Sequence, residues 1–317
     1  MSDRAAGIDA RRPATSAALG AALWRFSRPH TIIGTAASIA GLYVIAVQAL
    51  PGTGLGDGLG DLAWTLLAGL CVNVYIVGVN QLEDVEIDRL NKPFLPLAAG
   101  DLTRATARRV VLACGLVPVL LALSQGAVET VAVLAGLAVG TVYSVPPLRL
   151  KRFPVLAALS ITAVRSVVVN LGVALHFSQS LGGGAWSVPA AVWALTVFVL
   201  PFSFAIAILK DVPDAEGDRR FRIATFTLRL GVRRVLRIGL AALTVAYLGM
   251  ALAGPLLLEE TQPIVLAVTH LAALAVLWRM ALATDPRDRD AFTRFYMGVW
   301  KLFFLEYAFV ALAVLAA

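Results

Sequence analysis

The chain has 317 residues, of which 59% are hydrophobic and 15% charged, and its mean hydropathy is +0.81. This composition excludes an ordinary soluble domain and indicates a protein embedded in lipid. The formal net charge of +7 does not indicate a nucleic-acid partner, because the basic residues are spread over separate connections and form no single arm or helix face.

Nine apolar windows follow one another along the chain and predict membrane-spanning helices. They cover residues 24–50, 61–82, 107–124, 128–145, 153–177, 188–209, 233–255, 263–281 and 293–315. Turn-forming residues separate them, as in the glycine-rich stretch 51–60 and at Pro146 and Pro147. We therefore expect an all-α membrane protein with nine helices in one bundle and a single domain over residues 1–317.

The N-terminal residues 1–22 precede these helices, and we expect them to form a flexible cytoplasmic arm. Arg4, Arg11 and Arg12 before an apolar run also resemble a signal peptide. The apolar run nevertheless continues to about Leu50, which is too long for the core of a signal peptide. An uncleaved first span is therefore the favoured interpretation.

The basic residues predict the orientation of the bundle, since Lys and Arg near span ends collect on the cytoplasmic side. Of the 27 Lys and Arg residues, 25 lie in the N-terminal arm, in every second connection or at the span ends beside them, and only Arg165 and Lys301 lie deeper within predicted spans. We therefore expect the N-terminus in the cytoplasm and the C-terminus outside. High Ala, Arg and Gly usage favours a bacterial cytoplasmic membrane.

A first cluster of carboxylates lies at the predicted cytoplasmic end of the second span, in the segment NQLEDVEIDRLNKP. Asn80, Asp84 and Asp88 are four residues apart there and would line one face of a helix. Carboxylate and amide oxygens are hard ligands of the kind that Mg²⁺ prefers. The spacing therefore predicts half of a metal site.

A second cluster, KDVPDAEGD, follows the sixth predicted span. Asp211, Asp214 and Asp218 could share a helical face, although Pro213 and Gly217 indicate that the helix unwinds. Mg²⁺ usually bridges one or two carboxylates to substrate phosphates, so we expect two Mg²⁺ ions, one at each cluster, to hold one diphosphate. The alternative is that both clusters are solvated helix ends.

Cations near both clusters could bind the same diphosphate. Lys92 follows the first cluster, Lys210 lies beside the second, and Lys151 follows the fourth predicted span. For any one of them, a role in orientation alone is an equally good interpretation, and Lys92 and Lys151 are the preferred ligands. The remaining candidates at this end are Arg28, Arg149 and Arg152.

Polar residues inside spans are costly in lipid and are therefore candidate site residues. Asn73 lies two turns before Asn80 on the same predicted face, and Tyr143 precedes the Pro-Pro turn, where it could contact a cation or the diphosphate. Arg165 either lines a cavity or forms an internal structural pair. The other polar residues of this kind are Asn170, His176, which is expected to be interfacial, and Lys301 and Glu306, which are expected to be structural.

The two clusters resemble the aspartate-rich motifs of the UbiA superfamily of intramembrane prenyltransferases, NQxxDxxxD or NDxxDxxxD and DxxxD. Asn80, Asp84 and Asp88 match the first motif, and Asp214 and Asp218 match the second. The segments NQLEDVEIDRLNKPFLPLAAG, YSVPPLRLKR, LKDVPDAEGDRRF and WKLFFLEY resemble in particular the branch of homogentisate phytyl- and prenyltransferases.

The resemblance implies a central cavity that opens to the cytoplasm beneath cap loops, with Mg²⁺ and an isoprenyl diphosphate, such as a geranylgeranyl or phytyl donor, at its rim. It also implies that Asp84, Asp88, Asp214 and Asp218 act in catalysis, and that an aromatic acceptor such as homogentisate takes up the prenyl group. A terpene cyclase, in which the prenyl chain traps its own cation, is one alternative. A non-enzymatic transporter is another, although its polar site would usually lie near the midplane.

Overall fold

The computed structural model describes residues 16–221 and 223–317. Within these residues nine helical segments are long and apolar enough to cross a membrane, which confirms the predicted number of spans. They are α2 (Pro29–Gln48), α3 (Leu59–Glu83), α6 (Arg104–Gln125), α7 (Ala127–Ser144), the continuous segment Pro154–Leu181 that includes α8 (Pro154–Thr162) and α9 (Val169–Leu181), α10 (Ala190–Leu209), α13 (Val232–Leu257), α14 (Pro263–Leu282) and α15 (Arg289–Leu315).

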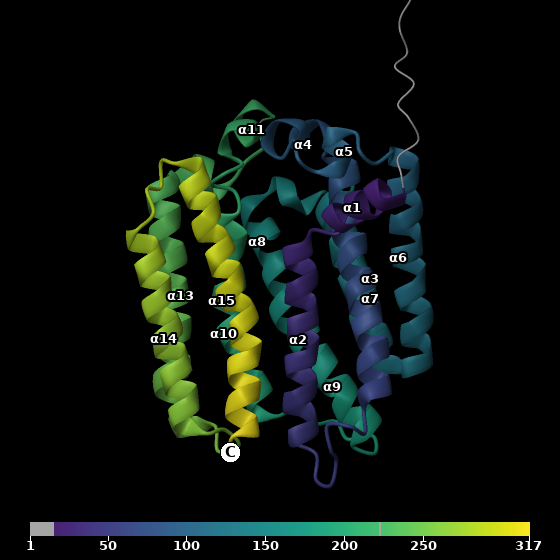
Figure 1. Cartoon of the computed structure of the whole chain (residues 1–317), viewed down its shortest axis with the longest axis vertical. Coiled ribbons are helices and arrows are strands. Elements are labelled where there is room, and N and C mark those ends of the chain that lie inside the picture. The colour runs from purple at the N-terminus through teal and green to yellow at the C-terminus, as the bar shows by residue number, and fades with distance from the viewer. Residues whose placement is uncertain (1–15, 222) are drawn as a thin grey trace, which may run out of the picture.

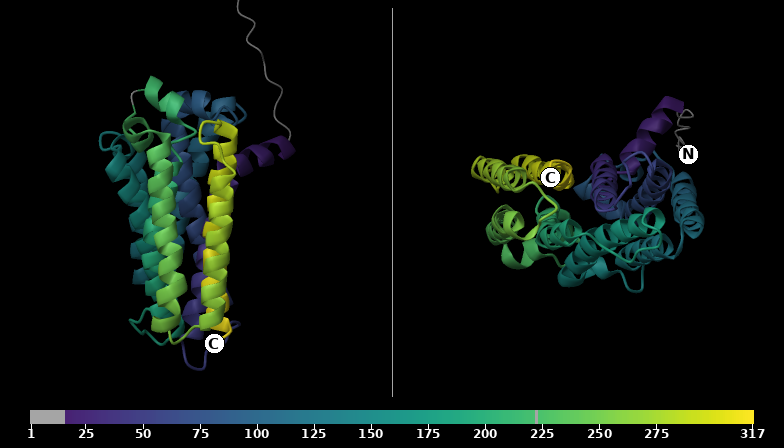
Figure 2. Two further views of the ribbon diagram at one scale, coloured as in Figure 1. Left: turned by 90° about the vertical axis from the view of Figure 1, so that its left-hand side faces the viewer. Right: turned by 90° about the horizontal axis from the view of Figure 1, so that it is seen from below.

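The spanning helices stand side by side in a ring (Figures 1 and 2). Helices that follow one another in the chain pack together, and α15 returns to pack against α2, so the last span closes the ring onto the first. No strand occurs among the described residues. The fold is therefore the all-α membrane bundle that the sequence predicts.

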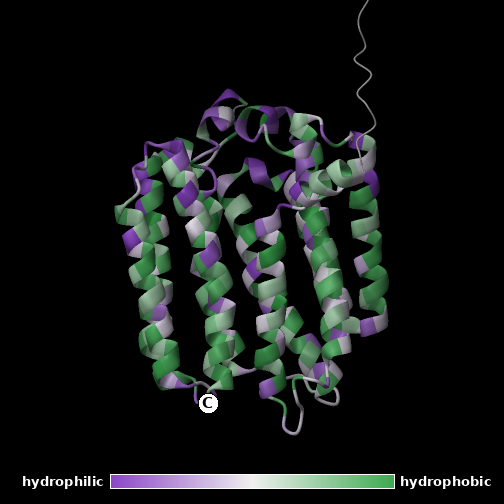
Figure 3. Ribbon diagram, viewed as in Figure 1, coloured by the Kyte–Doolittle hydropathy of each residue, from purple (hydrophilic) through white to green (hydrophobic). Residues whose placement is uncertain are grey.

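The outer surface of the bundle is apolar along the spans and polar at the ends (Figure 3). On α6, Leu112, Leu116 and Leu120 are each more than half exposed at intervals of four residues, so they form one outward face. A continuous apolar face of this kind is unfavourable in water and suits contact with lipid.

Short helices gather at one end of the ring and form a cap. They are α1 (Ser16–Phe26), α4 (Val85–Asn91), α5 (Pro96–Ala99), η1 (Leu150–Arg152), α11 (Ala215–Arg220) and α12 (Phe226–Leu230). Figure 1 shows α1, α4, α5 and α11 at this end and the C-terminus at the opposite end. Both aspartate clusters belong to this cap.

The first predicted span, residues 24–50, is wrong at its beginning. The chain breaks between α1 and α2, where Arg28 has a left-handed backbone with φ of 53° and Pro29 begins α2. Gln81 on α3 donates a hydrogen bond of 2.7 Å to the backbone oxygen of Phe26 and so holds this break in place. Of the expected arm, residues 1–15 lie outside the described residues, and residues 16–22 belong to α1, which projects from the side of the bundle (Figure 2).

The packed core borders a cavity inside the ring. The largest buried hydrophobic cluster includes Leu42, Phe202 and Tyr247 and lies where α2, α10, α13 and α15 meet. Gly41 allows α2 and α15 to approach closely, because a Cβ at Gly41 would lie 3.0 Å from the backbone oxygen of Tyr307. The space left between α2, α3, α7 and α8 holds the cavity described next.

Candidate active site

A cavity of about 1310 Å³ begins beneath the cap and extends deep into the bundle. Its lining includes Asp84 at the cap and Thr65 and Glu129 toward the opposite end. Thr65 precedes Asp84 by 19 residues in the chain, which corresponds to roughly 28 Å at the helical rise of 1.5 Å per residue. The cavity is therefore long enough to hold an extended lipid-like chain.

Every residue predicted as a metal ligand or substrate contact lines this one cavity. These residues are Arg28, Asn73, Asn80, Asp84, Asp88, Lys92, Tyr143, Lys151, Arg165, Lys210, Asp211, Asp214 and Asp218, and Arg149 and Arg152 join them. The clusters are thus brought together at one end of the bundle, although more than 100 residues of chain separate them.

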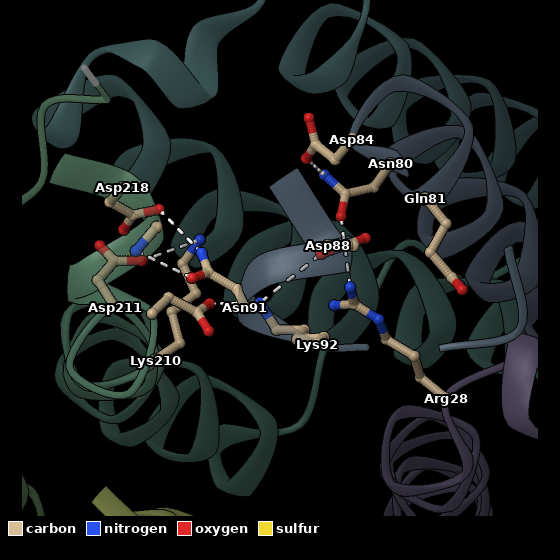
Figure 4. A network of polar contacts seen from close by, with 12 residues as sticks. Arg28, Asn80, Gln81, Asp84, Asp88, Asn91, Lys92, Lys210, Asp211 and Asp218 are labelled. Atoms are coloured by element: carbon tan, nitrogen blue, oxygen red, sulfur yellow. Dashed lines mark hydrogen bonds and ion pairs between the residues drawn. The ribbon is translucent and has the colours of Figure 1, made fainter. Parts of the chain in front are cut away.

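The first cluster lies where α3 gives way to α4. Asn80 is in the last turn of α3, Asp84 is the residue between the two helices, and Asp88 lies within α4. The single continuous helix implied by the spacing is wrong, because Asp84 leaves helical geometry with φ of −111° and ψ of 16°. The break turns α4 across the end of the bundle, and the three side chains still face the cavity (Figure 4).

The second cluster lies between α10 and α11. Asp211 follows the end of α10, Asp214 immediately precedes α11, and Asp218 lies within it. The turn between these helices agrees with the unwinding that Pro213 indicates in the sequence. Figure 4 shows Asp211 and Asp218 across the site from Asn80 and Asp84.

Asn91, which sequence reasoning missed, joins the two clusters. Its Oδ1 accepts a hydrogen bond of 3.1 Å from the backbone N–H of Gly217, and its Nδ2 donates to Asp218 at 3.5 Å. Arg289 at the start of α15 donates a 2.7 Å hydrogen bond to the backbone oxygen of Asn91. One buried amide side chain thus links α4 directly to α11.

Cations contact aspartates of both clusters in this structure. Arg149 and Lys151 contact Asp84 at 2.9 and 2.6 Å, and Lys92 forms an ion pair with Asp214. The other contacts of this kind join Lys210 to Asp211 at 3.5 Å and to the Tyr143 hydroxyl at 2.9 Å, and Arg28 to Asn80 at 3.5 Å. The predicted cations thus lie in direct contact with the predicted metal ligands.

The burial of these charges shifts their proton affinities. Burial, opposed mainly by Lys92, raises the pKa of Asp88 to about 6. Burial and repulsion from Asp211 and Asp214 raise the pKa of Asp218 to about 7. Burial lowers the pKa of Lys151, although Asp84 opposes this shift. Burial makes the ionised form of these carboxylates unfavourable, and a metal cation that displaces the proton would stabilise that form.

The ligand types suit Mg²⁺, although they are not gathered around one point. Among the described residues no group of three or more His, Cys, Asp or Glu side chains converges as a ready metal site. All of the candidate ligands are hard oxygen donors, and Oδ2 of Asp88 is buried with no hydrogen-bond partner. An incoming Mg²⁺ could satisfy that oxygen, so the residues fit the ion.

The other predicted polar residues divide between cavity and core. Asn73 lines the cavity but is also tied to α2, since it donates to Thr35 and accepts from Thr31, both at 2.9 Å. Asn170 accepts a hydrogen bond from Tyr307 at 2.8 Å in the core. His176 is only 2% exposed and is therefore not the interfacial residue that was expected. Lys301 is exposed. Glu306 contacts His270 of α14 at 3.0 Å, which agrees with the structural role expected of it.

Two features of the cavity wall were missed from the sequence. Glu129 lies at the beginning of the fourth predicted span, lines the cavity and is 3% exposed, and it makes no hydrogen bond or ion pair with any described residue. Near the cap, His30, Tyr296 and Trp300 add aromatic rings to the wall. Trp300 belongs to the segment WKLFFLEY, so a pattern was available for it, whereas Glu129 gave no signal beyond its place at a helix start.

Comparisons with known proteins agree with this architecture. A model of the UbiA prenyltransferase family matches residues 35–305. A homogentisate phytyltransferase from Synechocystis sp. is 46% identical over 303 residues, which cover 92% of this chain and 95% of the relative. A homogentisate solanesyltransferase from Arabidopsis thaliana is 39% identical over 298 residues, covering 90% of this chain and 75% of the relative.

Solved structures show the same fold. A UbiA homolog from Archaeoglobus fulgidus, bound to DMAPP and Mg²⁺, superposes with a TM-score of 0.65 at 19% sequence identity. The superposition covers 92% of this chain and 99% of that one. A structure of a UbiA homolog from the same organism with GPP and Mg²⁺ gives a TM-score of 0.63 at 20% identity over 92% of this chain and all of that one.

Proposed function

The chain belongs to the UbiA prenyltransferase family, and we propose that it transfers an isoprenyl group from an isoprenyl diphosphate to homogentisate or a similar aromatic acceptor within the membrane. The observation that carries this proposal is that two aspartate clusters from separate connections face each other over the mouth of one long cavity. We treat residues 1–317 as one prenyltransferase domain.

Asn80, Asp84 and Asp88 would hold one Mg²⁺, and the second cluster, Asp211, Asp214 and Asp218, would hold another. The proposal of two ions is based on the presence of two clusters. Bound Mg²⁺ would supply positive charge that stabilises a departing diphosphate. Among these residues, Asp84, Asp88, Asp214 and Asp218 are proposed as the catalytic carboxylates.

The cations that now contact the carboxylates would bind the diphosphate. Lys92 and Lys151 line the cavity and pair with Asp214 and Asp84, so each could exchange an aspartate oxygen for a phosphate oxygen. Lys210 and Arg28 lie on opposite sides of the same mouth (Figure 4). Tyr143, hydrogen-bonded to Lys210, would orient that lysine.

The deeper cavity would receive the prenyl chain and keep water from the allylic cation formed on ionisation. A geranylgeranyl or phytyl chain has sixteen backbone carbons and extends roughly 20 Å, from C–C bonds of about 1.5 Å. That length fits within the cavity. The aromatic acceptor would then attack the cation with its ring carbon and lose the proton from that carbon.

Turnover with purified protein tests the function. Detergent-solubilised protein is incubated with geranylgeranyl diphosphate and Mg²⁺, with and without homogentisate. We expect a prenylated aromatic product and diphosphate release that both require the acceptor and disappear with EDTA. A cyclic hydrocarbon formed without acceptor would instead establish the terpene cyclase alternative, and transport of either substrate without product would establish the transporter.

We also propose that the cap faces the cytoplasm of a bacterial cell and that the C-terminus lies outside. The cap end is hydrophilic (Figure 3) and carries basic residues such as Lys92, Lys151 and Arg219, which supports this orientation. An alkaline phosphatase fused to Ala317 would then be active, because that enzyme needs an extracytoplasmic location. An inactive C-terminal fusion beside an active fusion in the connection 51–58 would contradict the proposed position of the C-terminus.

A further inference from the structure

We propose that Arg165 binds the carboxylate of the aromatic acceptor, and that the acceptor ring lies against Trp300 between Arg165 and the aspartate clusters. This inference rests on the proposed function, because it assigns a place for the second substrate. It identifies that substrate as an aromatic carboxylate rather than a neutral phenol.

The guanidinium of Arg165 is a charge without a counter-ion. Its side chain forms no hydrogen bond or ion pair with any residue in the described part of the chain, and its Nη1 is buried with no hydrogen-bond partner. Arginine inside a membrane bundle normally pairs with an anion or faces a functional cavity. Arg165 lines the cavity and is half-buried, so an anion entering the cavity can reach it.

Aromatic rings surround this cation. The Cζ atom of Arg165 lies 4.7 Å from the ring centroid of Trp300 and 5.4 Å from that of Phe303. His30 meets the Trp300 ring edge to face at 5.1 Å between centroids. The indole Nε1 of Trp300 has no hydrogen-bond partner at normal distance and angle, although Tyr296 lies next to it. An unsatisfied guanidinium N–H beside flat apolar surfaces suits a ring that carries a carboxylate.

The position of Arg165 along the cavity favours the acceptor over the diphosphate. The carboxylates of the clusters already have Lys92, Lys151 and Lys210 beside them, whereas Arg165 contacts none of these carboxylates. Arg165 follows Pro154, where its span begins at the cap, by 11 residues, which corresponds to roughly 16 Å along a helix. Arg165 therefore lies below the rim and deeper in the cavity than the clusters, where an acceptor could reach the reactive end of the prenyl donor.

The local backbone supports this position. Residues Ala163–Val168 form a π-helical turn inside the otherwise α-helical span Pro154–Leu181, and such turns occur frequently at functional sites. Helical side chains incline toward the N-terminal end of their helix. For this span the N-terminal end lies at the cap, so the long side chain of Arg165 extends from the middle of the membrane toward the reaction centre.

The test compares homogentisate with methylhydroquinone, which has the same ring without the carboxylate. Arg165→Met removes the charge at similar length, Arg165→Lys keeps it, and Arg109→Gln, an exposed arginine of α6 outside the cavity, is the control. Arg165→Met should weaken homogentisate binding by about 10- to 100-fold, the range for losing a charge-assisted hydrogen bond. Arg165→Lys should restore part of this loss, and Arg109→Gln should bind normally.

Methylhydroquinone and the prenyl diphosphate should show unchanged KM values in Arg165→Met. Equal weakening of both acceptors, or an increase confined to the KM of the prenyl diphosphate, would overturn the assignment, and the second result would place the diphosphate at Arg165. If Arg165→Met does not fold, Arg165→Lys and the preference of the wild-type protein for homogentisate over methylhydroquinone decide the question. A wild-type protein without that preference would contradict the inference.

Calorimetric binding of homogentisate separates this inference from the proposed function. If the wild-type protein binds homogentisate through Arg165 but forms no prenylated product, the proposed carboxylate site is supported and the proposed reaction is rejected. If the protein forms product and Arg165→Met binds homogentisate as tightly as the wild type does, the proposed reaction is supported and the proposed site at Arg165 is rejected.

Discussion

The contact between Asn91 and Gly217 predicts that adding one methyl group will separate the two aspartate clusters. A Cβ at Gly217 would lie 2.0 Å from Oδ1 of Asn91, so one of the two must move by at least about 1 Å to reach an ordinary contact. If Asn91 rotates, it gives up its hydrogen bonds to the Gly217 N–H and to Asp218. If α11 moves instead, Asp218 moves with it.

Either response should lower the rate strongly in Gly217→Ala. Leaving a buried polar group without its partner costs about 1–3 kcal/mol, and a displacement of about 1 Å at a reacting centre can reduce the rate on the order of 100-fold. The assay measures kcat and its Mg²⁺ dependence with geranylgeranyl diphosphate and homogentisate. We expect a lower kcat and a higher Mg²⁺ requirement.

Two further variants isolate the cause. Gly249→Ala on α13 is the control, because a Cβ there meets nothing within 4 Å. The double variant with Asn91→Ala removes the clash, so it should be no worse than Asn91→Ala alone. Wild-type kinetics in Gly217→Ala, or a double variant in which the two losses add, would refute the steric argument.

Three other predictions concern the cavity and its rim. Asp84→Asn and Asp218→Asn should each abolish turnover with helix content unchanged by circular dichroism, and normal activity in either would remove the metal assignment. Glu129→Ala removes a buried carboxyl from the far end of the cavity, so it should raise the rate with a solanesyl donor relative to a geranylgeranyl donor. The exposed Glu259→Ala is the control, and unchanged donor selectivity in Glu129→Ala would disprove that role. Because burial raises the pKa of Asp88 to about 6 and of Asp218 to about 7, the metal-free protein should be more stable at low pH and lose stability as pH rises through these values. Mg²⁺ needs the ionised carboxylates, so it should raise Tm more at pH 8 than at pH 6, and an equal increase at both would contradict the assignment.

The number of spans and the location of the clusters could be predicted from local pattern. Nine apolar windows and the alternation of basic connections are properties of continuous segments, and each cluster lies at the end of one such segment. The cavity wall could not be predicted in the same way. Glu129 lines it because α7 packs against α3 and α9, and no property of neighbouring residues determines which face of a uniformly apolar helix points inward.

The breaks between helices could not be predicted from the sequence pattern either. The predicted window 24–50 includes both Phe26 and Arg28, so the hydropathy pattern gives one span, whereas the hydrogen bond from Gln81 stabilises a turn there. The exposed and buried faces of α4 likewise depend on the bend at Asp84. In both places a contact with a distant helix determines the backbone, and propensity is overridden by tertiary packing.

The buried ionisable residues of the spans differ in whether they have partners, and this difference predicts opposite effects of replacing them. Glu306 is fully buried and contacts His270 Nε2 at 3.0 Å, whereas Arg165 has no such partner. Glu306→Ala leaves His270 unsatisfied and should reduce stability by about 1–3 kcal/mol, seen as a lower Tm in detergent. Because Glu306 does not line the cavity, its variant should bind homogentisate normally.

Arg165→Met should do the reverse, with a Tm equal to or above that of the wild type and weakened binding of homogentisate. Removing an unpaired buried charge relieves a desolvation cost, although it also forfeits the contact of Arg165 with Trp300, worth about 0.5–2 kcal/mol. The balance favours stability only if no anion of the protein compensates the guanidinium. If the Tm of Arg165→Met falls as far as that of Glu306→Ala, both residues stabilise the fold. The cavity would then hold no unpaired charge for the acceptor.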